Sequence, residues 1–270
     1  MAKLTRFYNS FQPNHYDIYL DIDRSAKKIS GKTTISGIAQ TSKIALHQKD
    51  LSVSTVQVDG QQVPFMLDSE RDALNITLPN SGEIQITIDY TAPLTDTMMG
   101  IYPSYYEVDG EKKQIIGTQF ETNFARQAFP CIDEPEAKAT FDLAIKFDEQ
   151  ADETILANMP ELRVENDIHY FDTTVKMSTY LVAFAFGELQ NKQTQTDSGV
   201  KVGVYATKAH DPKTLDFALD IAKRSIEFFE DFYQKNYPLS QSNQLALPDF
   251  SAGAMQNWGL VTSSEAYLVL

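Results

Sequence analysis

Two short segments carry polar side chains whose types and spacing could bind a small polar group. In "TQFET", Gln119 and Glu121 stand two positions apart. On an extended strand, side chains two residues apart project from the same face, so an amide and a carboxylate would line one surface. The second segment, "GAMQNWGL" at residues 253–260, joins two small residues, a thioether, two amides and the only tryptophan of the chain. Neither pattern by itself identifies a ligand, so these two candidate segments have no assigned function on spacing alone.

The histidines give no sign of a hydrolytic metal site. Zinc peptidases need three or four converging ligands and often carry two histidines four residues apart on a helix. The four histidines, at 15, 47, 169 and 210, contain no such pair. We therefore predict that each is a surface or structural residue. The sequence also lacks a G-x-S-x-G elbow, a phosphate-binding loop and a dinucleotide fingerprint.

Cys131, in "AFPCIDEP", is the only cysteine. A nucleophilic thiol needs a base, and no histidine lies within thirty residues on either side, so we predict a buried, inert thiol unless a base approaches in space. The adjacent Asp133, Glu134 and Pro135 predict a turn whose carboxylates accept backbone or arginine hydrogen bonds, with Arg126 as a candidate partner.

The composition is that of a globular, acidic protein. The chain has 270 residues, 42% of them hydrophobic, and 37 acidic against 23 basic residues, for a formal charge of −14. This charge disfavours nucleic acid and anionic membranes as partners. The sequence shows no signal peptide, no membrane helix and no possible internal disulfide, so we expect a cytoplasmic protein.

Most of the first two hundred residues alternate between apolar and polar side chains. In "HYDIYLDID" (15–23), Tyr16, Ile18, Leu20 and Ile22 point to one side of a strand and the aspartates to the other. Similar runs predict strands at 51–58, 73–78, 82–90, 139–147 and 201–207, with a turn at Asp59 and Gly60. The more apolar run 178–189 predicts a strand buried on both faces or a connection between domains.

The periodicity changes after His210. Asp211 is a candidate cap and Pro212 a first residue for a helix of about six turns ending near Pro238. Apolar residues recur along it in steps of three and four, at Leu215, Leu219, Ala222, Ile226, Phe229 and Tyr233. Segments 244–250 and 259–270 predict strands around a loop that carries the second candidate segment. Because residues 191–270 offer the helix little to pack against, we expect further chain after Leu270.

Two blocks together resemble the aminopeptidase N family of zinc metallopeptidases, in its bacterial cytoplasmic form. The blocks are "GTQFETNFARQAFPCIDEPEAKATFDL" and "PDFSAGAMQNWGLVT". The family typically has T-Q-x-E followed by A-R-x-x-F-P-C-x-D-E-P, and then the exopeptidase motif G-A-M-E-N. The resemblance implies a mainly β fold: a saddle-shaped antiparallel domain at 1–190, followed at 191–270 by the α+β opening part of a thermolysin-like domain.

The same resemblance assigns roles to the candidate residues. It implies that Glu121 binds the α-ammonium of a peptide and that Gln119 lines the pocket for the first side chain. The exopeptidase motif would pair with the peptide as an added strand, which suits the small side chains of Gly253 and Ala254. Trp258 would pack this segment in place. The substrate-binding residues are thus Gln119, Glu121, Gly253, Ala254, Met255, Gln256 and Asn257.

The sequence departs from the family pattern in two ways. Gln256 replaces the second ammonium-binding glutamate, which removes a charge-assisted contact and puts exopeptidase preference in doubt. The H-E-x-x-H helix, its glutamate ligand and the catalytic tyrosine are absent, so the zinc of the intact enzyme has no ligands or catalytic residues here. We expect an inactive part of an aminopeptidase; the alternatives are a non-catalytic β-rich binding or scaffold relative, or an epoxide hydrolase of the same family.

Overall fold

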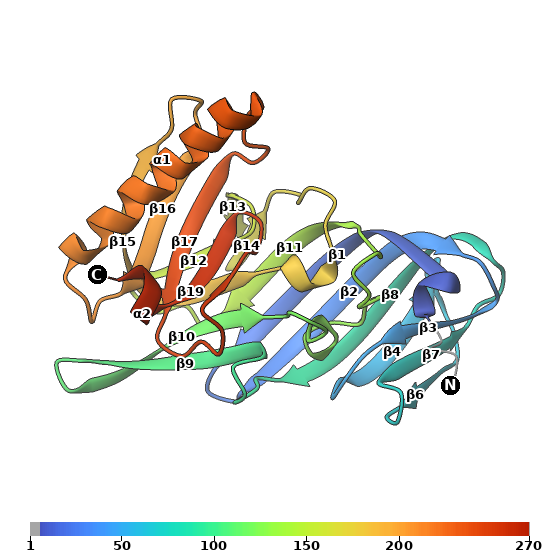
Figure 1. Ribbon diagram of the computed structural model, residues 1–270. Coiled ribbons are helices and arrows are strands. Elements are labelled where there is room, and N and C mark those ends of the chain that lie inside the picture. The colour runs from blue at the N-terminus through green and yellow to red at the C-terminus, as the bar shows by residue number, and fades with distance from the viewer. Residues whose placement is uncertain (1–5, 270) are drawn as a thin grey trace.

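The computed structural model describes residues 6–269, and strands dominate it (Figure 1). They form an eight-stranded sheet, a second sheet whose main path has seven strands, and a small three-stranded sheet. One long helix lies beside the second sheet, at the opposite end of the molecule from the small sheet (Figure 1). The predicted mainly β class is confirmed. None of the described helices combines the length and hydrophobicity required to cross a bilayer.

The eight-stranded sheet has the order β13-β14-β11-β1-β2-β8-β4-β5. All its neighbouring strands are antiparallel except β1 and β11, which pair in parallel. Its strands, in chain order, are β1 (Phe11–Asp23), β2 (Lys28–Ala39), β4 (Ser52–Val58), β5 (Gln61–Gln62), β8 (Gly82–Pro93), β11 (Thr140–Phe147), β13 (Glu161–Glu165) and β14 (Ile168–Phe171).

The predicted alternation in β1 is confirmed. Tyr16, Ile18, Leu20 and Ile22 are all buried, while Asp17 is exposed on the other face. A bulge interrupts the pairing with β2 between Pro13 and His15. Because side chains alternate, the extra residue reverses which face the following positions occupy. Pro13 is therefore buried, whereas His15 lies on the outer face with Asp17.

The second sheet has the order β18-β19-β17-β16-β15-β10-β9, and β12 pairs with β15 off this path. Its strands are β9 (Gly100–Val108), β10 (Glu111–Gln119), β12 (Glu153–Ala157), β15 (Phe184–Gln195), β16 (Lys201–Thr207), β17 (Gln241–Leu247), β18 (Ala254–Met255) and β19 (Leu260–Ser264). β15 is continuous through residue 190, where the sequence suggested a domain boundary.

The small sheet has the order β3-β7-β6 and closes the far end of the fold. Its strands are β3 (Lys43–His47), β6 (Phe65–Asp68) and β7 (Ala73–Thr77), and short 3-10 helices occur at η1 (Phe7–Asn9), η2 (Ala125–Gln127) and η3 (Thr179–Leu181). One contiguous apolar core runs from this sheet through the eight-stranded sheet and reaches Met255 of β18.

The predicted helix forms in two parts. Asp211 caps a 3-10 turn, η4 (Pro212–Leu215), by accepting a hydrogen bond from the Lys213 amide, and α1 (Asp216–Tyr233) follows. The helix ends earlier than Pro238 because Gln234 takes a left-handed conformation and its amide bonds back to the last turn. Leu215 is buried, but the apolar C-terminal half of α1 is not: Phe232 is 65% exposed.

The apolar run 178–189, expected as a buried strand or a connection, divides into two parts. Residues 178–183 form a 3-10 turn and extended chain, and β15 begins at Phe184. One strand prediction was wrong at its end. Residues 265–268, predicted as strand, form the short helix α2 (Glu265–Leu268). In this segment a hydrophobic run suggested a strand, although such a run alone does not separate strand from helix. Leu270 lies outside the described residues.

Candidate substrate-binding edge

Residues 253–257 lie at the open edge of the second sheet. β18 pairs with β19 on one side only, because it is the terminal strand of the sheet order. The Gly253 carbonyl accepts a hydrogen bond from the Ser264 amide (3.1 Å). Successive residues of a strand direct their main-chain groups to opposite sides. The N–H and C=O of Ala254 therefore point away from β19, toward the open edge.

The side chains of this segment alternate as an edge strand requires. Met255 and Asn257 are buried, and the Asn257 amide donates to the Thr262 hydroxyl (3.3 Å). Gly253, Ala254 and Gln256 are exposed. The open edge thus presents free backbone groups, two small residues and one amide side chain.

Asn158 and Gly259 fix this segment to the rest of the fold. The Asn158 side-chain amide donates to the carbonyls of Trp258 and Leu181 (2.8 Å each), and its oxygen accepts from the Ala183 amide (2.7 Å). Gly259 packs so closely that a Cβ there would lie 1.8 Å from the Asn158 carbonyl oxygen. The Trp258 ring contributes less than predicted, since the residue is 41% exposed.

The Gln119 segment is tied to the same part of β15. Beside Gln119, the Thr118 hydroxyl accepts from the Phe184 amide (3.1 Å) and lies 3.2 Å from the Phe184 carbonyl. Phe184 follows directly after Ala183, which bonds Asn158. Phe120 belongs to the same apolar core as Met255. Hydrogen bonds thus attach Thr118, next to Gln119, and Asn158, which bonds Trp258, to the adjacent residues Phe184 and Ala183.

Gln119 and Glu121 do not share a strand face as predicted. β10 ends at Gln119, and Glu121 lies in the following turn, so strand alternation does not orient it. Gln119 is 4% exposed, and its side-chain oxygen has no hydrogen-bond partner among the described residues. A buried, unpaired acceptor is costly and is commonly satisfied by a ligand or water. Glu121 is partly exposed.

Asp249 also holds the loop before β18 in place. Its amide donates to the Ser104 hydroxyl (2.7 Å), and its carboxylate accepts from the Tyr105 amide (2.7 Å) on β9. The Tyr102 hydroxyl donates to the Asp249 carbonyl (3.0 Å). Sequence reasoning singled out neither Asp249 nor Asn158, because a lone polar residue carries no periodic or motif signal.

The turn after η2 is structural. Arg126 Nε donates to Asp133 Oδ2 (3.0 Å), and the other carboxylate oxygen accepts from the Thr179 hydroxyl. Glu134 accepts from the amides of Phe7 and Tyr8. Both predicted roles are confirmed. Burial nevertheless raises the pKa of Asp133, against the opposing effect of Arg126.

Cys131 is fully buried, and burial raises the pKa of its thiol, as expected for an inert cysteine. His47 is a spatial neighbour through paired backbone hydrogen bonds. Its Nδ1 accepts from the Asp133 amide (3.1 Å) and its ring stacks on Phe7. His47 is thus engaged elsewhere, and burial, with a smaller contribution from Arg126, lowers its pKa to about 3.

The described residues do not gather the two-histidine set of a zinc peptidase. His47 contacts Asp133, His169 contacts Glu161, and His210 contacts Glu265. His15 lies on the outer face of the eight-stranded sheet. No two of the described histidines therefore meet at one site, and no step of catalysis is assigned to them.

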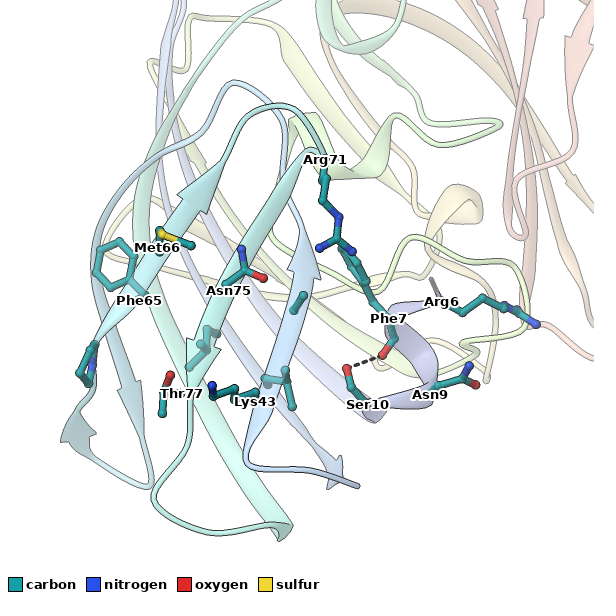
Figure 2. Close-up of a pocket in the computed structure, with 14 residues that line it drawn as sticks. Arg6, Phe7, Asn9, Ser10, Lys43, Phe65, Met66, Arg71, Asn75 and Thr77 are labelled. Carbon is teal, nitrogen blue, oxygen red and sulfur yellow. Dashed lines mark hydrogen bonds between the residues drawn. The ribbon is translucent and has the colours of Figure 1, made fainter. Parts of the chain in front are cut away.

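A separate cavity of about 860 Å³ lies beside the small sheet and contains none of the predicted binding residues (Figure 2). Arg71 extends along Phe7 there, with its guanidinium 5.5 Å from the ring centre, and Phe65 and Met66 of β6 form the opposite wall (Figure 2). Figure 1 places this region at the other end of the molecule from β19.

Comparison with known proteins agrees with this architecture of a mainly β region followed by a mixed one. The peptidase M1 N-terminal domain model matches residues 12–181, and the peptidase family M1 domain model matches residues 217–270. The chain belongs to the peptidase M1 family.

Among similar proteins, aminopeptidase N of Lactobacillus delbrueckii subsp. lactis is 64% identical over 98% of this chain and 31% of its own length. Aminopeptidase N of Lactobacillus helveticus is 62% identical over 98% of the chain and 32% of its own length. Endoplasmic reticulum aminopeptidase 1 of Mus musculus is 37% identical over 95% of the chain and 30% of its own length. The chain thus spans about a third of the length of these relatives.

Proposed function

We propose that this chain forms part of the substrate cleft of a cytoplasmic zinc aminopeptidase, which removes residues from the free N-terminus of peptides. The observation that supports this most is the open edge of β18. Ala254 offers a free N–H and C=O there beside residues without bulk, the arrangement used when a peptide adds to a sheet as a further strand.

The amine would be recognised by Glu121, with Gln256 as a second, neutral acceptor. A carboxylate binds an ammonium group through a charge-assisted hydrogen bond, which is about twice as strong as a neutral one. The unpaired oxygen of Gln119 would line the pocket for the first residue. Met255 and Asn257 would not contact the peptide. Met255 packs the edge strand against the core, and Asn257 bonds it to β19.

The proposed domain organisation has the saddle domain at 1–190 and the opening part of the peptidase domain at 191–270. Zinc would supply an activated water and polarise the scissile carbonyl, and its ligands would come from residues outside this chain. A non-catalytic scaffold role remains the alternative, and Gln256 is the residue that favours it.

Peptide binding to the 270-residue chain tests the proposal. We expect a peptide labelled at its C-terminus to bind more tightly with a free N-terminus than when acetylated, as measured by fluorescence anisotropy. Glu121→Gln should remove this difference while leaving the acetylated peptide unaffected. Equal affinity of the unmodified chain for both peptides would refute the assignment of Glu121.

A further inference from the structure

A histidine and two aspartates cluster on the outer face of the eight-stranded sheet, where β1 and β11 pair in parallel. His15 lies opposite Thr140 and Asp17 opposite Asp142 in the register. Both pairs are separated by two positions along their strands, so the four side chains share one face. The bulge before His15 is what brings its side chain to this face.

The spacing of the three groups suits metal ligands. His15 Nε2 lies 3.4 Å from Asp17 Oδ1 and 3.6 Å from Asp142 Oδ2, and one ligand atom from each residue lies within 4.8 Å of the others. A charge-assisted N–H to carboxylate hydrogen bond is about 2.7–2.9 Å long. Zinc bonds of about 2.0–2.2 Å at tetrahedral angles separate neighbouring ligand atoms by roughly 3.4 Å. The two distances from His15 Nε2 are close to this separation, and the shorter of them is also within hydrogen-bond range.

Thr140 lies beside the other ring nitrogen of His15. Its hydroxyl oxygen is 2.8 Å from His15 Nδ1 and 3.4 Å from the Asn14 carbonyl oxygen. In the tautomer that donates from Nδ1 to Thr140, Nε2 carries a lone pair that faces the two carboxylates. A metal-binding histidine is commonly oriented by such a bond from its other nitrogen.

In that tautomer, three electron-rich groups face one another. Asp17 and Asp142 are directly opposed, which is unfavourable for like charges on neighbouring strands. Asp142 Oδ1 is also buried and has no hydrogen-bond partner among the described residues. A cation between the groups would offset both costs.

Nearby cations are engaged with other groups. Lys32 and Arg163 line a surface depression of about 390 Å³ together with Asp17 and Asp142. Lys32 pairs with Asp89 (3.6 Å), while Arg163 pairs with Glu165 (3.6 Å) and lies over the Tyr170 ring. Within residues 6–269, no salt bridge joins either cation to Asp17 or Asp142.

We propose that His15, Asp17 and Asp142 bind a divalent transition-metal ion of the zinc class, with solvent completing its coordination. One imidazole and two carboxylates form a mixed ligand set that such ions accept. The ion would join β1 to β11, two strands far apart in the sequence, and so stabilise the folded sheet.

Isothermal titration of the metal-free 270-residue chain with zinc chloride tests the site. We expect one zinc ion to bind, with affinity reduced at least tenfold by His15→Gln and by Asp142→Asn. The matched control is His169→Gln, because His169 also lies between two carboxylates but contacts Glu161 directly at 2.8 Å. This control should bind zinc as the unmodified chain does.

Thermal unfolding separates loss of the site from loss of the fold. Zinc should raise the melting temperature of the unmodified chain and of His169→Gln. Asp142→Asn should melt no lower than the unmodified chain without zinc, since it relieves the opposed charges, yet gain nothing from zinc. Absence of zinc binding by the unmodified chain, or unchanged binding by Asp142→Asn, would overturn the proposal.

Discussion

In the proposed substrate cleft, the residue at position 256 sets how strongly the amine of a peptide is held. The amide of Gln256 can accept a hydrogen bond from an ammonium group, but it carries no charge. Gln256→Glu should therefore tighten binding of a free-amine peptide about tenfold, equivalent to about 1.4 kcal/mol. The measurement is anisotropy with labelled peptides at low ionic strength, and the acetylated peptide is the control. Equal tightening for both peptides would place residue 256 away from the amine.

His47 makes the stability of the fold depend on pH. Its pKa is lowered to about 3, from an ordinary value of 6.5, so the folded chain keeps it neutral while the unfolded chain binds a proton below pH 6.5. The stability contributed by neutral His47 is complete above pH 6.5 and is lost as the pH falls toward 3. Between pH 7 and pH 5 the loss should be about 2 kcal/mol.

Urea unfolding at the two pH values measures this effect. His47→Asn keeps an acceptor near the position of Nδ1 for the Asp133 amide, but it cannot titrate. The variant should lose about 2 kcal/mol less than the unmodified chain between pH 7 and pH 5. The same pH dependence in both proteins would assign the titration to other groups.

At the scale of elements, the edge strand depends on the close packing of the turn that follows it. Gly259 has a φ of +80° and leaves no room for a Cβ beside Asn158, whereas Gly60, at +79°, has nothing within 4 Å. Gly60→Ala should cost about 1–2 kcal/mol, the cost of the left-handed conformation alone. Gly259→Ala adds a clash with backbone and should cost at least about 2 kcal/mol more.

Chemical denaturation of both variants makes this comparison. Because Asn158 bonds Trp258 and Leu181 at once, the Gly259 variant should also weaken peptide binding, and the Gly60 variant should not. Equal destabilisation of the two variants would show that the turn shifts freely and does not fix β18.

For the whole molecule, the separate positions of the histidines predict that the 270-residue chain has no peptidase activity. Its described histidines have separate partners, so added zinc should give no chelator-sensitive hydrolysis of a chromogenic amino-acid amide. Aminopeptidase N of Lactobacillus helveticus would serve as the positive control. Turnover that persists in the purified chain and disappears with chelator would contradict this prediction, and Asp142→Asn would then show whether the ion at the outer face is responsible.

The sequence alone determined the mainly β class, most strand positions, the capped start of the long helix and the two candidate segments. These follow from local periodicity, capping and motifs, which act between residues close together in the chain. The strand predicted at 265–268 was wrong because a hydrophobic run does not specify backbone conformation.

Only the tertiary structure decided which distant residues meet. The sequence search considered histidines four apart on a helix and so set aside His15, whose partner Asp142 reaches it through the parallel pairing of β1 and β11. In the same way, the open edge of β18 and its attachment through Asn158 depend on strand order and long-range hydrogen bonds. Such contacts arise from packing the whole chain, and no local pattern encodes them.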